Sequence, residues 1–259
     1  MDKTILEVNN LTKVFKLTKK QKAERGISTS KEFKAVNNIS FSLSKGKIYG
    51  LLGPNGAGKT TTLRMVATML SATSGEVLFE GKNIYDDINA YRKKVGFLTS
   101  ELKLDDFFTP SYTYDFFSAL YGLTKEETEI RKKEIFARFG IEKFANSQIK
   151  NLSTGMKQKV SLAISLCHDP EVIIFDEPTN GLDVIAARDV EEFLINLKKE
   201  NKIIIISTHI FSLVEKLCDH VGIIISGKLV KDAPLKEIQK EGTLEEVFFK
   251  LYEEANVNA

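Results

Sequence analysis

Gly53-Pro54-Asn55-Gly56-Ala57-Gly58-Lys59-Thr60 is the stretch that decides the fold of this chain. Its spacing, G-x-x-x-x-G-K-T, is typical of a loop that cradles phosphates. The apolar residues 47–52 before it predict a buried strand, and residues 61–70 after it have helical apolar spacing. Glycines let backbone N–H groups approach the phosphates, and the helix N-terminus adds positive potential.

This loop therefore predicts a nucleotide site at the end of a strand. Lys59 is expected to contact the β- and γ-phosphates, and the Thr60 hydroxyl to ligate Mg²⁺. The predicted nucleotide-binding residues of the loop are Gly53, Pro54, Asn55, Gly56, Ala57, Gly58, Lys59, Thr60 and Thr61.

Composition places the chain among globular proteins. It has 259 residues, 42% hydrophobic and 28% charged, which is enough for a sizeable core. A net charge of +2 is too small to indicate nucleic acid, which we do not expect as a partner. Cys167 and Cys218 lie in apolar helical patterns, so we expect buried free thiols in a reducing compartment.

Membrane segments are not predicted in this chain. No apolar run approaches the roughly 18 residues of a membrane span, and residues 1–4 lack the apolar core of a signal peptide. If the protein works at a membrane, we expect another chain to supply the spans.

The residues before the loop predict an antiparallel β region. Residues 5–15 alternate apolar and polar side chains and predict an edge strand, and residues 35–43 resume the alternation. Between them, residues 16–34 are basic and lack periodicity, which indicates a loop or an irregular insertion. Its lysines form either a solvated face or a contact with anionic lipid or a partner.

A helical, aromatic-rich segment spans residues 102–144. Thr109 can cap a helix that has Pro110 in its first turn, and Thr124 with Glu127 forms a capping box for a helix ending at Gly140. We expect its aromatic residues to be mostly core, with some available as a docking surface for a partner helix. These residues are Phe107, Phe108, Tyr112, Tyr114, Phe116 and Phe117.

Two further apolar runs end in polar residues. Residues 172–175 predict a strand buried on both faces and lead into Asp176 and Glu177, while residues 202–206 lead to His209. Ligands in α/β sheets bind at the carboxyl ends of strands, so these side chains are expected to converge on the nucleotide. Asp176 would lie near Mg²⁺ through water, and Glu177 would orient and deprotonate the attacking water.

Residues 151–158, N-L-S-T-G-M-K-Q, precede another helix. Ser153 is a good N-cap for a helix starting near Gly155. A helix N-terminus with a hydroxyl and small residues predicts a second anion site, and a simply capped helix is the alternative.

Together these stretches resemble the ATP-binding subunit of ABC transporters, in the family's order and across nearly the whole chain. Residues 53–60 match its Walker A motif, and residues 173–183, I-I-F-D-E-P-T-N-G-L-D, match its Walker B motif and D-loop. Thr208-His209 matches its switch histidine. Residues 152–156 match its signature motif imperfectly, with Thr154 and Met156 as substitutions.

The motifs and the resemblance imply an α/β fold. We expect a P-loop NTPase core with a parallel sheet, an N-terminal antiparallel β subdomain and an inserted helical subdomain, all in one nucleotide-binding domain over residues 1–259. Residues 1–101 and 166–232 would form the core and β subdomain. Residues 102–165 would form the helical subdomain, and residues 233–259 a helical tail.

The resemblance also assigns roles that the residues alone leave open. Phe15 would stack on adenine, whereas without the family it is a core residue. Ser100 falls at the position of a glutamine that contacts Mg²⁺, and Glu101 is the alternative. His209 would hold the γ-phosphate together with the catalytic Glu177.

ATP and Mg²⁺ are the ligands that the resemblance implies. The resemblance implies a homodimer, in which two cassettes pair head to tail so that Ser153, Gly155 and Asp183 of one chain complete the ATP site of the other. A separately encoded permease would dock near residues 100–117, at the cytoplasmic face of the cell membrane.

The finer resemblance is to cassettes of ABC-2 type exporters, from the segment 244–248, L-E-E-V-F. Residues 96–99 and the basic insertion look similar to sodium-extrusion, Nat-type ATPases. Two alternatives remain: a soluble ABC ATPase acting on ribosomes or DNA, and a nucleotide-binding regulatory module with negligible turnover.

Overall fold

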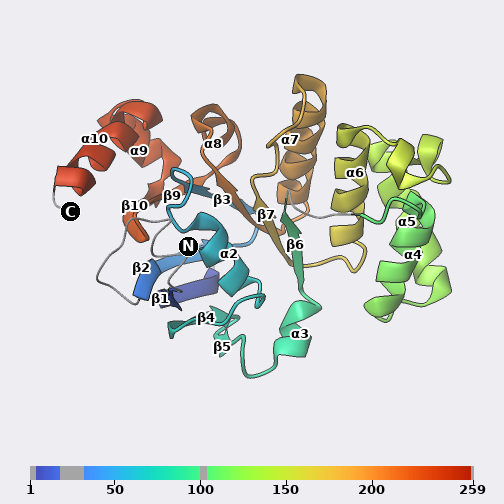
Figure 1. Cartoon of the computed structure of the whole chain (residues 1–259), viewed down its shortest axis with the longest axis horizontal. Coiled ribbons are helices and arrows are strands. Elements are labelled where there is room, and N and C mark those ends of the chain that lie inside the picture. The colour runs from blue at the N-terminus through green and yellow to red at the C-terminus, as the bar shows by residue number, and fades with distance from the viewer. Residues whose placement is uncertain (1–3, 18–31, 100–103, 258–259) are drawn as a thin grey trace.

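Two sheets form the centre of the molecule in this computed structural model, which describes residues 4–17, 32–99 and 104–257 (Figure 1). The smaller sheet is antiparallel, with the order β2-β1-β4-β5. Its strands are β1 (Thr4–Lys16), β2 (Glu32–Ser44), β4 (Ser74–Phe79) and β5 (Lys82–Asn83).

The expectation that β1 is an edge strand is wrong. It pairs with β2 on one side and with β4 on the other. Alternation of apolar residues shows that one face of a strand is buried, but it carries no information on how many strands are hydrogen-bonded to it. The antiparallel β region itself is present as expected.

The larger sheet has six strands in the order β10-β9-β3-β8-β7-β6. Neighbouring strands from β9 to β6 are parallel, and β10 pairs with β9 as an antiparallel hairpin. The strands are β3 (Lys47–Leu52), β6 (Val95–Thr99), β7 (Val172–Asp176), β8 (Ile203–Thr208), β9 (His220–Ile225) and β10 (Lys228–Pro234).

Helices and the smaller sheet cover the two faces of this larger sheet. Along β8, Ile204 and Ile206 belong to a core shared with the helices, whereas Ile203 and Ile205 face the core shared with the small sheet and α2. Every residue of β7 and β8 is buried, as expected for strands at the sheet centre. The helices on these layers are α2 (Lys59–Val66), α3 (Ile88–Arg92), α7 (Val184–Lys199), α8 (Phe211–Leu217), α9 (Leu235–Glu241) and α10 (Leu244–Val257).

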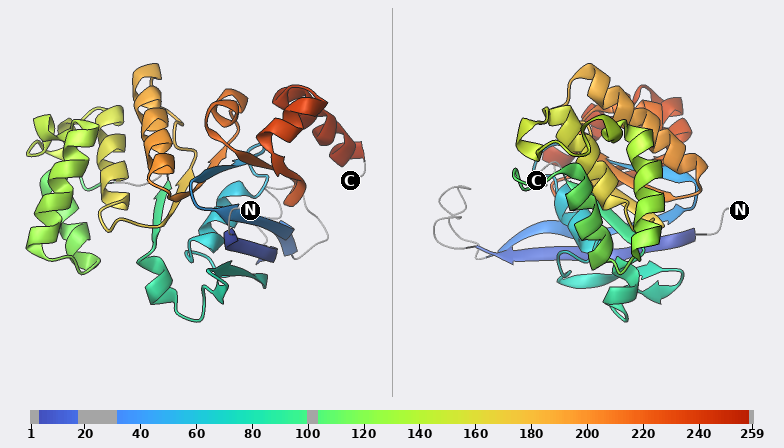
Figure 2. Two further views of the ribbon diagram at one scale, coloured as in Figure 1. Left: turned by 180° about the vertical axis from the view of Figure 1, so that it is seen from behind. Right: turned by 90° about the vertical axis from the view of Figure 1, so that its right-hand side faces the viewer.

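A helical group lies at one end of the molecule, opposite α9 and α10 (Figure 2). It contains α4 (Pro110–Leu120), α5 (Lys125–Phe139) and α6 (Thr154–Ser165). The predicted caps are confirmed. Thr109 accepts a hydrogen bond from the Tyr112 amide, Thr124 and Glu127 form a capping box, and Gly140 ends α5 with a positive φ.

The aromatic residues of this group are less buried than expected. Tyr114 is 1% exposed, but Phe107, Phe108, Tyr112 and Phe116 are 73%, 42%, 52% and 50% exposed. Aromatic content does not distinguish a core from a surface that binds a partner. A core buries its apolar rings when the chain folds, whereas a binding surface buries them only when the partner binds. None of the helices in the described ranges is long and apolar enough to span a membrane.

Residues 167 and 168 connect the helical group to the sheet. His168 stacks on Tyr121 of α4's end with ring centroids 3.7 Å apart, and its Nε2 lies 3.0 Å from the Val95 carbonyl oxygen. Burial lowers the pKa of His168 to about 4, so it is neutral near pH 7. Cys167 and Cys218 are buried free thiols, as expected, and burial raises the pKa of Cys167 to about 11.

Candidate functional site

The phosphate-cradle loop joins the carboxyl end of β3 to the N-terminus of α2. Two of its glycines are required by close backbone contacts. A Cβ on Gly53 would lie 2.3 Å from the Ile224 carbonyl oxygen, and one on Gly58 would lie 2.5 Å from that of Ala35. Gly58 also has φ 107°, a conformation that other residues rarely adopt. The loop is thus fixed between β2 and β9 with its amides at the start of α2.

Lys59 is held at the mouth of this loop. Its side chain is 5% exposed, and Nζ donates to the carbonyl oxygens of Gly53 at 2.7 Å and Pro54 at 3.2 Å. The same ammonium lies 3.3 Å from Glu177 Oε1. Burial of a charge is costly unless it is paired, so these contacts keep the ammonium where a phosphate would replace them.

Hard oxygen ligands meet next to the loop. Thr60 Oγ1 donates to Asp176 Oδ1 at 3.0 Å, and Ser207 Oγ donates to the same carboxylate oxygen. Asp176 is 6% exposed and ends β7. One hydroxyl and one carboxylate fit Mg²⁺, which prefers oxygen and usually takes only one or two protein ligands beside phosphates and water. These two residues would hold the ion.

Glu177 is fixed by its backbone and paired through its side chain. Its amide donates to the carbonyl oxygen of Ser207 at 3.1 Å and its Oγ at 3.2 Å, and its φ is 55°. Left-handed backbone in a glutamate is strained and is often found at functional sites. His209 Nδ1 lies 3.0 Å from Glu177 Oε2. Beside its ion pair with Lys59, the buried Oε1 accepts no hydrogen bond within the described ranges, so a lone pair remains for one from water.

A cavity of about 260 Å³ brings most of the predicted nucleotide-binding residues together. Its lining residues are Phe15, Phe33, Ala35, Pro54, Asn55, Gly56, Gly58, Lys59, Thr60, Thr61 and Glu177. Aromatic rings therefore line the cavity together with the phosphate loop, so one space can receive both a base and its phosphates.

Phe33 is a cavity residue that sequence reasoning missed. It pairs directly with Phe15 across β1 and β2, and Phe15 is 37% exposed. The sequence interpretation ended the irregular insertion at residue 34, whereas β2 begins at Glu32. The signal was the apolar alternation of Ile39, Phe41 and Leu43, whose period of two continues back to Ala35 and Phe33.

Three predicted residues lie away from this cavity. Ser153 caps α6 by accepting from the Met156 amide at 3.3 Å, and Asp183 caps α7 by accepting from the amides of Ile185 and Ala186 at 2.9 Å. A Cβ on Gly155 would lie 3.1 Å from the Ala186 Cβ, so the two helix starts are packed together. Ser100 and Glu101 lie outside the described residues.

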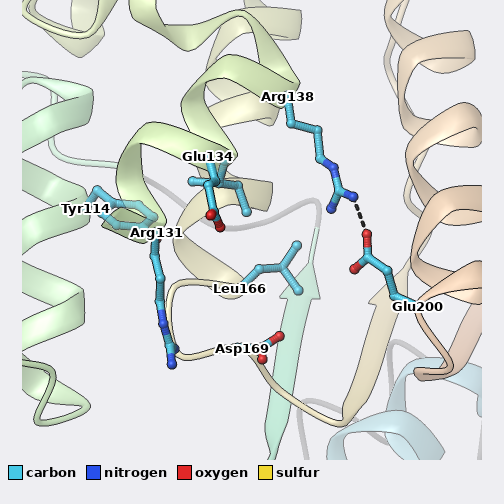
Figure 3. A pocket seen from close by; sticks show the side chains of 8 residues that line it. Tyr114, Arg131, Glu134, Arg138, Leu166, Asp169 and Glu200 are labelled. Carbon is cyan, nitrogen blue, oxygen red and sulfur yellow. Dashed lines mark hydrogen bonds and ion pairs between the residues drawn. The ribbon is translucent and has the colours of Figure 1, made fainter. Parts of the chain in front are cut away.

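A larger cavity, of about 460 Å³, lies between α5, the segment after α6 and the end of α7 (Figure 3). Figure 3 shows Arg138 of α5 directed toward Glu200, with which it forms an ion pair. Asp169 pairs with Lys202, and Arg131 donates to the Cys167 carbonyl oxygen at 3.3 Å. Because Arg138, Asp169 and Glu200 are ion-paired and none of the predicted site residues lines this cavity, we describe it as the junction between the helical group and the sheet.

Comparison with known proteins agrees with this geometry. The family model for the ABC transporter matches residues 36–180, more than half of the chain. The chain belongs to the ABC transporter family. The match contains the phosphate loop, the residues of the signature motif, and the Asp176-Glu177 pair. The resemblance inferred from the motifs is confirmed, and the chain is an ATP-binding cassette of the ABC ATPase class.

Relatives of this cassette include named transport proteins. It is 37% identical over 218 residues to the ABC transporter ATP-binding protein NatA of Bacillus subtilis (strain 168), covering 84% of this chain and 89% of the relative. It is 35% identical over 213 residues to the lantibiotic transport ATP-binding protein SrtF of Streptococcus pyogenes, covering 82% and 89%.

Solved structures confirm the expected α/β fold. The structure of an ATP-binding subunit of an ABC transporter matches with a TM-score of 0.81 and 26% identity, covering 96% of this chain and 99% of that one. The structure of cbiO1 from Clostridium perfringens, part of the ABC transporter complex cbiONQ, matches with a TM-score of 0.78 and 27% identity, covering 99% of each chain.

Proposed function

We propose that this cassette hydrolyses ATP to power export through a separate membrane permease at the cytoplasmic face of the membrane. The observation that carries the proposal is the contact chain Lys59–Glu177–His209 at the mouth of the phosphate loop, with distances of 3.3 Å and 3.0 Å. The transport names of NatA and SrtF support coupling to a permease.

In the proposed reaction, Lys59 and the loop amides bind the phosphates and offset their charge. Mg²⁺ bound at Thr60 and Asp176 would supply further positive charge for the phosphate oxygens. Glu177 Oε1 accepts a hydrogen bond from the attacking water and takes its proton, while His209 holds Oε2 and so fixes the carboxylate.

A second copy of this chain would complete the site. Ser153, Gly155 and Asp183 do not line the cavity, yet the residues that follow Asp183 form an exposed apolar pair. Val184 is 86% exposed and Ile185 is 77% exposed, next to the packed starts of α6 and α7. An apolar surface beside the signature residues supports head-to-tail pairing of two cassettes, in which these residues close on the γ-phosphate of the partner.

Phe15 and Phe33 together would form the platform for adenine. Directly opposed side chains in an antiparallel pair are close neighbours, so both rings can contact one base. We expect Phe15→Ala and Phe33→Ala each to weaken ATP binding by about 1–3 kcal/mol, or roughly 5- to 150-fold in Kd, as for other base–aromatic stacks. Titration with a fluorescent ATP analogue measures this, with Phe33→Tyr, which keeps a ring, as the control. An unchanged Kd for Phe33→Ala would remove that residue from the platform.

The exposed aromatic residues of the helical group would dock the permease. Phe107, 73% exposed, and Phe116, 50% exposed, are expected to bury their rings against it. Changing both to serine should weaken the association by about 2 kcal/mol or more, roughly 30-fold in Kd, as for interface aromatics. ATP binding should be unchanged. The measurement is co-purification of the permease from solubilised membranes.

Val257→Ser, at a position that is 86% exposed on α10, is the matched control and should leave the association intact. Equal recovery with the double variant would show that the permease docks elsewhere. Recovery of ribosomes or DNA in place of a membrane protein would favour the soluble ABC ATPase.

The proposal also includes the identity of the exported substrate. We infer sodium efflux from the similarity of residues 96–99 and of the basic insertion to Nat-type ATPases, and the identity to NatA supports this placement. Sodium tolerance of cells that contain the cassette and its permease, compared with cells that contain Glu177→Gln, tests it. Equal tolerance would leave export in place and exclude sodium.

A further inference from the structure

An aromatic cluster connects the C-terminal helix α10 with the start of α8, close to His209. Phe211 is the first residue of α8 and lies two positions after the histidine. Its ring meets Phe248 edge-on at a centroid distance of 5.2 Å and an angle of 68°, and it lies 6.2 Å from the ring of Phe249. Phe248 stacks on Tyr252 at 6.1 Å. Helix α10 contacts both α8 and β9, and lies on the same side of the sheet as α8 (Figure 1).

Few hydrogen bonds hold the start of α8, apart from the one that the Ile210 amide donates to Thr208 Oγ1 at 3.0 Å. Its N-cap, Ile210, makes no side-chain capping bond in the described part of the chain, and the first backbone bond of the helix, from the Val214 amide to the Ile210 carbonyl oxygen, is 3.4 Å long. Short helices are marginal in water without tertiary packing. Leu213 and Val214 of this turn are buried in the core, and the contact of Phe211 with α10 anchors the first residue of the helix.

The segments on either side of His209 determine the orientation of its imidazole. On one side Thr208 ends the fully buried strand β8. On the other side the chain enters α8. The imidazole itself is 44% exposed, and its Nδ1 contacts Glu177 Oε2 at 3.0 Å. Because solvent does not restrain a side chain, the backbone between Thr208 and Phe211 sets where the imidazole points.

We propose that Phe211 and Phe248 are positioning residues for ATP hydrolysis. Helix α10 clamps the start of α8, and the clamp holds the His209 imidazole against Glu177. The proposal rests on the proposed role of His209 in the reaction. A shift of α10 would therefore change the rate of ATP hydrolysis although this helix does not contact ATP. The shift would be transmitted from Phe248 to Phe211, and then through His209 to the Glu177 carboxylate.

The test uses the full-length protein and the variants Phe211→Leu and Phe248→Leu, which keep apolar volume but lose the ring contact. We expect kcat for ATP to fall about tenfold, below the roughly 10²-fold that a 1 Å misplacement can cost. KM and ATP binding should be unchanged, because the phosphate loop is untouched. In a His209→Ala background the same Phe211→Leu change should have no further effect on kcat, as expected for residues that act as one unit.

Phe41→Leu is the matched control. It removes another stacked aromatic pair, in which Phe41 of β2 contacts Tyr49 of β3 at a centroid distance of 4.8 Å. It should lower the melting temperature comparably and leave kcat unchanged. Phe211→Tyr keeps the ring and should retain normal kcat even if the leucine variants fold poorly.

Two results would overturn the clamp: an equal loss of kcat for Phe211→Leu with and without His209, or an equal loss for Phe41→Leu. If His209→Ala alone keeps full kcat, the proposed role of the histidine fails, and the clamp fails with it. If His209→Ala loses activity but Phe211→Leu does not, only the clamp is wrong.

Discussion

Replacing Glu177 by glutamine should lower the rate of ATP hydrolysis by about 10²–10⁴-fold, the usual contribution of a general base. The amide cannot take a proton from water, although it has nearly the same shape. ATP should still bind, because the bonds that hold this residue in place, to the carbonyl oxygen and Oγ of Ser207, come from its backbone amide. Steady-state phosphate release and titration with a fluorescent ATP analogue measure the two effects separately.

Glu192→Gln is the control for this substitution. Glu192 forms an exposed ion pair with Arg188 on α7, and such pairs contribute little, so its loss should not change the rate. If the unmodified protein and Glu177→Gln hydrolyse ATP equally slowly with the permease present, the protein is a regulatory module that binds nucleotide without significant turnover. A large difference between the two proteins supports the catalytic assignment of Glu177.

Much of the fold could be predicted because local signals agreed with the tertiary structure. The loop at residues 53–60 lies between a strand and a helix, as its spacing requires, and the apolar runs at 172–175 and 203–206 form the sheet centre. The helices with predicted caps at Thr109 and Thr124 are also present. These features depend on short-range patterns of burial and on backbone conformation, which a single sequence carries.

What could not be predicted depends on neighbours that are distant in the sequence. The alternation in β1 fixed its buried face, but only the structure shows pairing with both β2 and β4. Phe116 of α4, and Phe107 just before that helix, are exposed because no segment in the described part of the chain covers them, and sequence composition does not distinguish such a surface from a core. Phe33 became part of the site through its register with Phe15 across 17 intervening residues, a relation set by strand pairing.

Lys59→Ala should abolish ATP binding at ordinary nucleotide concentrations. Removing one partner of a buried, hydrogen-bonded charge pair costs about 2–5 kcal/mol, or roughly 30- to 4,000-fold in Kd. Lys59 is 5% exposed, and its ammonium is held by two loop carbonyls and Glu177, so a phosphate would meet it without further desolvation. Lys59→Met keeps the length of the side chain and should bind ATP as poorly, which separates the charge from the packing. Equilibrium titration of the monomer measures both.

Ser153→Ala is the informative comparison, because the two substitutions act on different halves of the proposed composite site. Ser153 lies outside the cavity that contains Lys59, so binding of ATP to the monomer should remain, whereas ATP-dependent dimerisation and hydrolysis should be impaired. Ser153→Asn preserves an N-cap and controls for the cost of uncapping α6. Loss of monomer binding in Ser153→Ala would contradict the head-to-tail arrangement and place the signature residues in the same site as Lys59. Retained binding in Lys59→Ala would contradict the assignment of the phosphate loop to the nucleotide site.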